Sequence, residues 1–478
     1  MNVKKTKKGK EKRRQIDLRL EVKNFGPISK ADVEIKPLTM FIGPNNSGKS
    51  YLAMLVRSAY IPLELNLVVN FMKSNNSADQ YISNFFANSK IEPNEELTIP
   101  KKQAEKLIKK YLNKLYLFNT DIIMRLFSSH FKDLIQSYQN EFSIKIKQHK
   151  ILTRLSYKKS DNKLKSNFSL KIIPKKITLK NIDNTNIGNF SDEMVININQ
   201  RHNKINKNNA FNEMIHAFYF DYNLINITFY LPAERSMLMK VGKTIASEII
   251  YKAQLAGIKD LETSKISGAE AEFLLNIINL PEKKGHFYSL ASEFERELID
   301  GEIALKFTDK PYPEIKFIFH ESDIPLHRAS STVTTIAPLI LYLKYLIEPG
   351  HVLIIEEPES HLDPKNQTIL AKYLVRLRRA GVYIVITTHS EYLFSQLNNF
   401  LLLSKVNPEE RIKKFGYKED DYLNPDEMSA YVFEKDKKSI GFNTKKIKID
   451  KGVMDDEFLF IHEALYKESF NLQQNLED

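Results

Sequence analysis

Residues 43–50 combine glycines, a lysine and a serine at a spacing that suits phosphate binding. They match the pattern G-x-x-x-x-G-K-[ST] at every fixed position and read Gly43-Pro44-Asn45-Asn46-Ser47-Gly48-Lys49-Ser50. Glycines let backbone N–H groups turn towards an anion, and a helix that starts here would present its N-terminus to the phosphates. We expect Lys49 to reach the β- and γ-phosphates and the Ser50 hydroxyl to ligate Mg²⁺. The sequence therefore predicts that this segment binds ATP.

Two adjacent glutamates, Glu356 and Glu357, are the second candidate. They directly follow residues 351–355, an uncharged run typical of a strand buried on both faces of a parallel sheet. Open α/β sheets bind ligands at the carboxyl ends of their strands. Neighbouring strand residues point to opposite sides, so we expect Glu356 to hold Mg²⁺ through water and Glu357 to polarise the attacking water. An isolated Glu-Glu pair is more often a solvated turn, but the phosphate loop in the same chain favours the functional interpretation.

The third candidate, His389, lies just past the next apolar run at residues 382–386. A neutral imidazole there could contact the γ-phosphate and sense whether it is present. A single histidine is often an ordinary hydrogen-bonded loop residue, and only its place at a second strand end favours a function. We therefore predict Lys49, Glu357 and His389 as catalytic residues.

The surrounding chain predicts the elements that would position these residues. An apolar run at 38–42 precedes the phosphate loop, and a helical pattern follows at 52–59. Residues 18–35 alternate around Gly26-Pro27, which predicts a hairpin. We expect an α/β fold with a mixed sheet, flanking helices and an antiparallel β part. The other predicted elements are strands at 226–232, 302–307, 314–320, 351–355 and 382–386, and helices at 243–255, 269–280, 335–346 and 364–379.

The organisation of the chain suggests a large α+β insertion. Helical stretches such as 102–117 are followed by lysine-rich alternation at 143–147 and 168–172, which predicts strands with lysines on one face. The predicted segments are a basic solvated tail (1–14), the N-terminal part of the nucleotide-binding unit (15–60), the insertion (61–225), the C-terminal part of that unit (226–405) and a C-terminal α/β extension (406–478).

Composition excludes several classes of protein. The 478 residues include no cysteine, so a thiol nucleophile and a Cys-ligated zinc site are excluded. No apolar run approaches the roughly 18 residues that span a bilayer. The basic start leads into residues 15–18, which do not form the apolar region of a signal peptide. We expect a cytoplasmic protein.

The net charge of +12 comes from two segments. Residues 1–14 carry +7 and residues 141–180 carry +10, which leaves −5 for the rest of the chain. The second segment is a candidate surface for nucleic acid or for an acidic protein partner. Lysine-rich exposed strands are also a common solvated face, so both interpretations stay open.

The motifs together resemble those of ABC-type AAA family ATPase heads of the SMC and RecF group. They are most similar to the predicted ATPases grouped with OLD-family proteins and associated with phage defence. The resemblance covers residues 16–60 and 226–405. The matching segments are Asn24-Phe25-Gly26-Pro27-Ile28, the phosphate loop, Tyr230-Leu231-Pro232-Ala233-Glu234-Arg235-Ser236, Glu356-Glu357-Pro358-Glu359-Ser360-His361-Leu362 and Thr387-Thr388-His389-Ser390.

This resemblance implies a P-loop NTPase head of ABC type that sandwiches two ATP molecules in a head-to-tail homodimer or higher oligomer. Ser330 and Ser331 would form the signature segment that binds the partner's γ-phosphate. Thr332 stands where the family's Ser-x-Gly core has glycine. A Ser/Thr run at a helix start is also ordinary N-capping. Asp363 would lie in the loop where the two heads meet.

OLD-family proteins also carry a C-terminal Toprim nuclease, which needs an Asp-x-Asp pair. The 89 residues after His389 are short for that domain and hold no such pair. We expect a separate effector protein, a nuclease or a toxin, and an anti-phage role for an ATP-driven dimer switch. The alternatives are a DNA-binding repair ATPase of RecF or SMC type and a catalytically weak nucleotide-binding scaffold.

Overall fold

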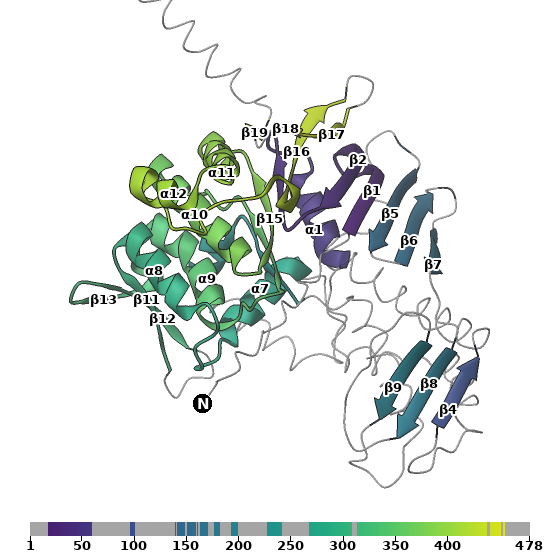
Figure 1. The fold of residues 1–478 in the computed structure, drawn as a ribbon, viewed down its shortest axis with the longest axis horizontal. Helices are drawn as coiled ribbons and strands as arrows, with labels where there is room; N and C mark the ends of the chain where they lie inside the picture. The colour runs from purple at the N-terminus through teal and green to yellow at the C-terminus, as the bar shows by residue number, and fades with distance from the viewer. Residues whose placement is uncertain are drawn as a thin grey trace, which may run out of the picture.

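A computed structural model describes the fold (Figure 1). It describes residues 18–59, 139, 141–147, 158, 160, 227–240, 267–307, 313–436 and 440–449, and only the backbone of 96–100, 148, 151–157, 163–170, 176–181, 193–198, 450 and 453–454. The predicted tail at 1–14 and the predicted helices at 102–117 and 243–255 lie outside these residues. None of the described helices has the length and apolarity needed to cross a membrane.

An eleven-stranded mixed sheet forms the centre of the molecule and confirms the predicted mixed α/β fold class. Five neighbouring strands are parallel, and the pairings beyond them are antiparallel apart from β17 with β2. In spatial order the strands are β10 (Thr228–Leu231), β14 (Val352–Glu356), β15 (Tyr383–Thr388), β3 (Leu38–Ile42), β16 (Met428–Lys435), β17 (Phe442–Lys446), β2 (Ile28–Ile35), β1 (Leu18–Phe25), β5 (Glu141–Gln148), β6 (Ile151–Lys158) and β7 (Lys163–Leu170).

Alternate residues of the central strands face two apolar cores. Met40 of β3 packs in the core that holds helices α9 and α10, whereas Phe41 packs in the core that holds α1. Likewise, Ile355 of β14 packs in the first of these cores and Ile354 in the second. Strands buried on both faces need apolar side chains throughout, which explains why these segments read as continuous apolar runs.

The helices lie on both sides of the parallel strands. Figure 1 shows α8, α9, α10 and α11 on the side of β15 away from α1. Helix α10 has the predicted bounds, whereas α9 starts four residues before the prediction because Ser330 caps it. The helices are α1 (Lys49–Ala59), α7 (Gly268–Ile278), α8 (Tyr288–Ile299), α9 (Ser331–Tyr345), α10 (Pro364–Arg379), α11 (Glu391–Leu403) and α12 (Pro408–Phe415), with short 3₁₀ turns at Leu326–Arg328 and Pro425–Glu427.

Three smaller sheets complete the described fold. The predicted strands at 302–307 and 314–320 are found in the first of them, with slightly shorter bounds. The strands are β11 (Glu302–Lys306), β12 (Glu314–Phe319) and β13 (Ser322–Pro325), then β4 (Glu96–Pro100), β8 (Lys176–Asn181) and β9 (Glu193–Ile198), and last β18 (Ile449–Asp450) and β19 (Val453–Met454).

Two pairings in the large sheet join segments that the sequence analysis treated separately. Strand β16, from the expected C-terminal extension, pairs in parallel with β3 beside the phosphate loop. Strand β5, from the expected insertion, pairs with β1 and continues the same sheet. Periodicity predicts a strand but not its neighbour, so these pairings could not be read from sequence. The division into five segments stays a prediction.

A buried ion pair joins α8, α9 and β11. The Lys344 ammonium lies 2.6 Å from a Glu295 carboxylate oxygen, and both side chains are almost completely buried. Lys344 also donates to the carbonyl of Ile303 at 2.8 Å, and Glu295 accepts from the Ile303 N–H at 2.8 Å. Burial raises the pKa of Glu295, and Lys344 opposes that shift.

Replacing Lys344 with methionine should lower the free energy of unfolding by about 3–5 kcal/mol, because a buried carboxylate would lose its counter-charge. Urea-induced unfolding measures the change. The double variant Lys344→Met/Glu295→Gln should lose less, since it leaves no bare charge while an amide oxygen can still accept from Ile303. A single variant as stable as the wild type would contradict this role for the ion pair.

Candidate nucleotide-binding and hydrolysis site

The three predicted groups lie at one edge of the sheet. Register places Thr388 of β15 opposite Ile42, the last residue of β3, and Thr387 opposite Glu356 of β14. Because these strands are parallel and adjacent, the residues that follow them emerge side by side. The phosphate loop, the glutamate pair and His389 are therefore brought together, although the loop lies more than 300 residues before the other two in the chain.

The phosphate loop connects β3 to α1, as its pattern predicted. Gly43, Asn46 and Gly48 have φ angles of 150°, 60° and 101°. A Cβ atom at Gly43 would lie 2.9 Å from the Cβ of Phe433, and one at Gly48 would lie 2.7 Å from a side-chain carbon of Ile28. Glycine is therefore needed at both positions for its conformation and for its lack of a side chain.

Lys49 is folded back over this loop. Its ammonium donates to the carbonyls of Gly43 at 2.9 Å and Pro44 at 2.8 Å, and the residue is 5% exposed. Burial lowers the pKa of Lys49, whereas the charges of Glu357, Glu359 and Glu356 raise it. The loop thus holds a cation at the position where the pattern expects phosphate contact.

Ser50 and Glu356 fit a magnesium site. Burial raises the pKa of Glu356, and the hydroxyls of Tyr230 and Ser50 and the Ala233 N–H oppose that shift. The Oε1 atom of Glu356 is buried and has no hydrogen-bond partner in the described part of the chain. A bare carboxylate oxygen near a hydroxyl offers the oxygen ligands that Mg²⁺ prefers, directly or through water.

The Glu357 side chain lies beside His389. Its Oε1 is 3.9 Å from the His389 Nδ1, and its Oε2 accepts from the Ser360 hydroxyl at 3.4 Å. Glu357 has a φ of 42°, and its N–H donates to the carbonyl of Thr387 at 2.9 Å. The turn after β14 is therefore tied to β15, and the Glu357 carboxylate is held near the His389 imidazole. Their catalytic roles stay predictions.

Glu359 is a site residue to which the sequence analysis gave no role. Its Oε1 accepts from the Thr388 hydroxyl at 2.6 Å and from the His389 N–H at 2.9 Å, and lies 3.5 Å from the His389 Nδ1. Its Oε2 is buried and none of the described residues bonds to it. The sequence signal for this residue was its place as the third acid of the Glu-Glu-Pro-Glu run. Its role could not be predicted, because its partner Thr388 lies about 30 residues further along the chain.

Arg235 was quoted only as part of a motif, and the structure gives it a positioning role. Its guanidinium is buried and donates only to backbone carbonyls. Burial lowers the pKa of Arg235 to about 10. These bonds connect β10, the turn that carries Glu357 and the first part of α9. The acceptors are Pro232 at 3.1 Å, Thr335 at 3.0 Å, Glu356 at 2.7 Å, Glu357 at 3.0 Å and Pro358 at 3.4 Å.

Two of the three expected signature and interface residues, Ser330 and Asp363, serve as helix caps. Ser330 caps α9 by accepting from the Val333 N–H at 3.3 Å, and Ser330 and Ser331 are exposed. Asp363 caps α10 by accepting from the Asn366 N–H at 3.0 Å. Capping explains Ser330 and Asp363 locally, and contact with a partner's nucleotide stays a prediction for all three residues.

The basic segment 141–180 is partly described. The Lys145 ammonium lies 2.5 Å from a Glu21 oxygen, and the Lys158 ammonium lies 2.9 Å from a Glu141 oxygen. Both lysines are therefore paired with acids from the same sheet. Lys147 is also described, whereas the side chains of the remaining Lys and Arg residues of this segment are not. Nucleic-acid binding stays a prediction.

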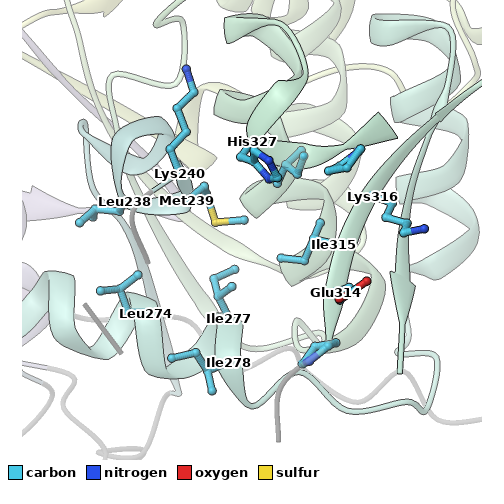
Figure 2. A pocket seen from close by; sticks show the side chains of 13 residues that line it. Leu238, Met239, Lys240, Leu274, Ile277, Ile278, Glu314, Ile315, Lys316 and His327 are labelled. Atoms are coloured by element: carbon cyan, nitrogen blue, oxygen red, sulfur yellow. The ribbon is translucent and has the colours of Figure 1, made fainter. Parts of the chain in front are cut away.

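Two cavities differ in character. An open hollow of about 510 Å³ lies beside the glutamate pair and is lined by residues 359–361, 367 and 389–392. An apolar cavity of about 230 Å³ lies between α7 and β12. Figure 2 shows Met239, Ile277 and Ile315 pointing into this second cavity, with the ammonium of Lys240 directed away. Of these two cavities, the first is lined by one predicted site residue, His389, and the second by none.

Replacing Arg235 with methionine should destabilise the protein by about 3–5 kcal/mol, because several buried carbonyls would lose their donor. Urea unfolding measures the loss, and amide hydrogen exchange at residues 356–360 should speed up. Arg296→Met is the matched control, because Arg296 is exposed and bonds only the Ser292 carbonyl of its own helix. Equal stability of the two variants would contradict the positioning role of Arg235.

Part of the chain resembles a known bacterial protein. The chain is similar over 189 residues to "Uncharacterized ABC transporter ATP-binding protein YhaQ" of Bacillus subtilis (strain 168), at 23% identity. The match covers 39% of this chain and about half, 48%, of that protein.

Solved structures of SMC heads align with most of the chain, but with low TM-scores. A Pyrococcus furiosus structure of the Smc head bound to the C-terminal domain of ScpA gives a TM-score of 0.41 at 11% identity, covering 97% of this chain and 99% of that chain. The SMC head from Thermotoga maritima gives 0.35 at 9% identity, covering 91% and 100%. Residues 18–394 match the sequence pattern of the AAA ATPase domain family. The chain belongs to the AAA ATPase domain family.

Proposed function

We propose that this protein binds ATP with Mg²⁺, hydrolyses it to ADP and phosphate, and uses the cycle to switch the association of two heads. The observation that carries the proposal is the meeting of the phosphate loop, the glutamate pair and His389 at the ends of three adjacent parallel strands. The 3.9 Å approach of Glu357 to the His389 Nδ1 supports it.

The residues suggest a division of roles in hydrolysis. The N-terminus of α1 and Lys49 would hold the phosphates. Ser50 and Glu356 would hold Mg²⁺, which neutralises charge on the phosphate oxygens. Glu357 would accept a hydrogen bond from water and orient it towards the γ-phosphorus, while the Ser360 hydroxyl holds the carboxylate. His389 would contact the γ-phosphate and report its presence.

The switch requires a second copy of the chain. The exposed Ser330 and Ser331 at the N-terminus of α9 would bind the partner's γ-phosphate, and Asp363 would lie at the contact. ATP would favour the closed dimer, or a higher oligomer, and hydrolysis would open it. From the resemblance of the motifs we infer that a separate effector protein reads this state, as the sensor half of an anti-phage system.

The variant Glu357→Gln should bind ATP normally but hydrolyse it about 100-fold or more slowly, because an amide cannot take up the proton of the attacking water. Turnover assays and light scattering with and without ATP should show the variant accumulating as an ATP-bound dimer. Glu282→Gln, an exposed position, is the control. A wild type without turnover or nucleotide-dependent association would refute the proposed function. Turnover without any change of assembly would refute only the dimer switch.

Substitutions of Glu359 should affect turnover differently from Glu357→Gln. Glu359→Gln should keep most of the turnover, because an amide oxygen can still accept from Thr388 and His389. Glu359→Ala should lose about tenfold or more, since two buried donors would lose their acceptor and His389 would be less well placed. Steady-state kinetics compare the two variants. If glutamine were as damaging as alanine, the charge of Glu359 would be required and its role as an acceptor would be refuted.

A further inference from the structure

Two successive carbonyls in the loop after β14 are held by side chains from two different helices. The Thr332 hydroxyl, from the first turn of α9, donates to the carbonyl of His361 at 2.9 Å. The Gln367 amide, from the first turn of α10, donates to the carbonyl of Leu362 at 2.8 Å. His361 has a φ of 59°, a conformation that side-chain-bearing residues adopt only at a cost. Contacts from outside the loop therefore help to hold it in this form.

From Gln367 the hydrogen bonds continue to the end of β15. The Ser390 hydroxyl donates to the Gln367 Oε1, and the Ser390 N–H donates to the Thr388 hydroxyl at 3.0 Å. Thr388 in turn donates to Glu359, which also accepts from the His389 N–H. The loop that carries Glu359 and Ser360 is thus fastened on one side to α9 and on the other to the His389 segment.

We propose that Thr332 is a positioning residue that couples the N-terminus of α9 to Glu357 and His389 in the same chain. This inference rests on the proposed ATPase function and gives it a regulatory link. Glycine, which the resemblance of the motifs implies for this position, has no hydroxyl and could not make the bond to His361. The hydroxyl of Thr332 therefore connects the α9 segment to the loop that carries Ser360.

The coupling has a defined direction. A group bound at Ser330 and Ser331 would fix the first turn of α9, and Thr332 would then hold the His361 carbonyl and the loop around it. Ser360 in this loop bonds the Glu357 carboxylate at 3.4 Å. The position of the Glu357 carboxylate thus depends on whether the first turn of α9 is fixed by a bound group. The phosphate loop is not part of this chain of hydrogen bonds.

The test compares four variants of the full chain. Thr332→Val removes the hydroxyl at nearly constant shape, and Thr332→Ser restores it. Thr332→Gly installs the residue of the resembling family. Thr335→Val is the matched control on the same helix, because the Thr335 hydroxyl is buried and has no hydrogen-bond partner among the residues that the structure describes.

Loss of one net hydrogen bond corresponds to about a three- to tenfold change. We expect Thr332→Val and Thr332→Gly to lower kcat by this factor at unchanged KM for ATP, and Thr332→Ser and Thr335→Val to match the wild type. Amide exchange at residues 360–363 of the ATP-free protein should speed up in the first two variants only.

The outcomes separate the coupling from the function on which it rests. Normal turnover of the wild type, with Thr332→Val equal to Thr335→Val in kcat and in exchange, would overturn the coupling and leave the ATPase intact. A Thr332→Gly variant with raised kcat would also overturn it, because the threonine would then hinder hydrolysis. A wild type without turnover would refute the proposed function and the coupling to hydrolysis with it.

Discussion

The parallel pairing of β3, β14 and β15 is the constraint on which the rest of the structure depends. Thr388 lies opposite Ile42 and Thr387 opposite Glu356, so that three chain segments leave the sheet at one edge. A shift of one residue in either pairing would turn each side chain to the other face of the sheet. Apolar residues on both faces of these strands oppose such a shift, because it would exchange the members of two distinct cores.

The site is held together by charged groups that bond backbone rather than opposite charges. Arg235 donates to carbonyls of three segments, and Lys49 donates to two carbonyls of its own loop. Both cations are also close to Glu356, Glu357 and Glu359, whose charges raise the pKa of Lys49 and of Arg235 against the effect of burial. The contacts that order the backbone therefore also hold these two cations near the acids at this edge of the sheet.

Several acceptors at this edge are buried and unused. The Glu356 Oε1, the Glu359 Oε2 and the Ser47 hydroxyl have no hydrogen-bond partner within the described part of the chain. A buried polar group without a hydrogen-bond partner lowers the stability of a protein core. Such groups are explained where a ligand or ion binds to them. The stability that the surrounding cores provide thus supports a preformed site with unused polar groups, which fits the ATP and Mg²⁺ that we propose as its ligands.

The sequence by itself determined the local elements of this protein. The glycines of the phosphate loop, the strand before it, the bounds of α10 and the placement of Glu357 and His389 at strand ends follow from spacings of a few residues. Only the tertiary structure decided that β16 adjoins β3, that Arg235 reaches carbonyls 121 and 122 residues away, and that Thr332 meets His361. A periodic pattern reports which face of an element is buried, but the partner in a non-local contact depends on how the whole chain packs.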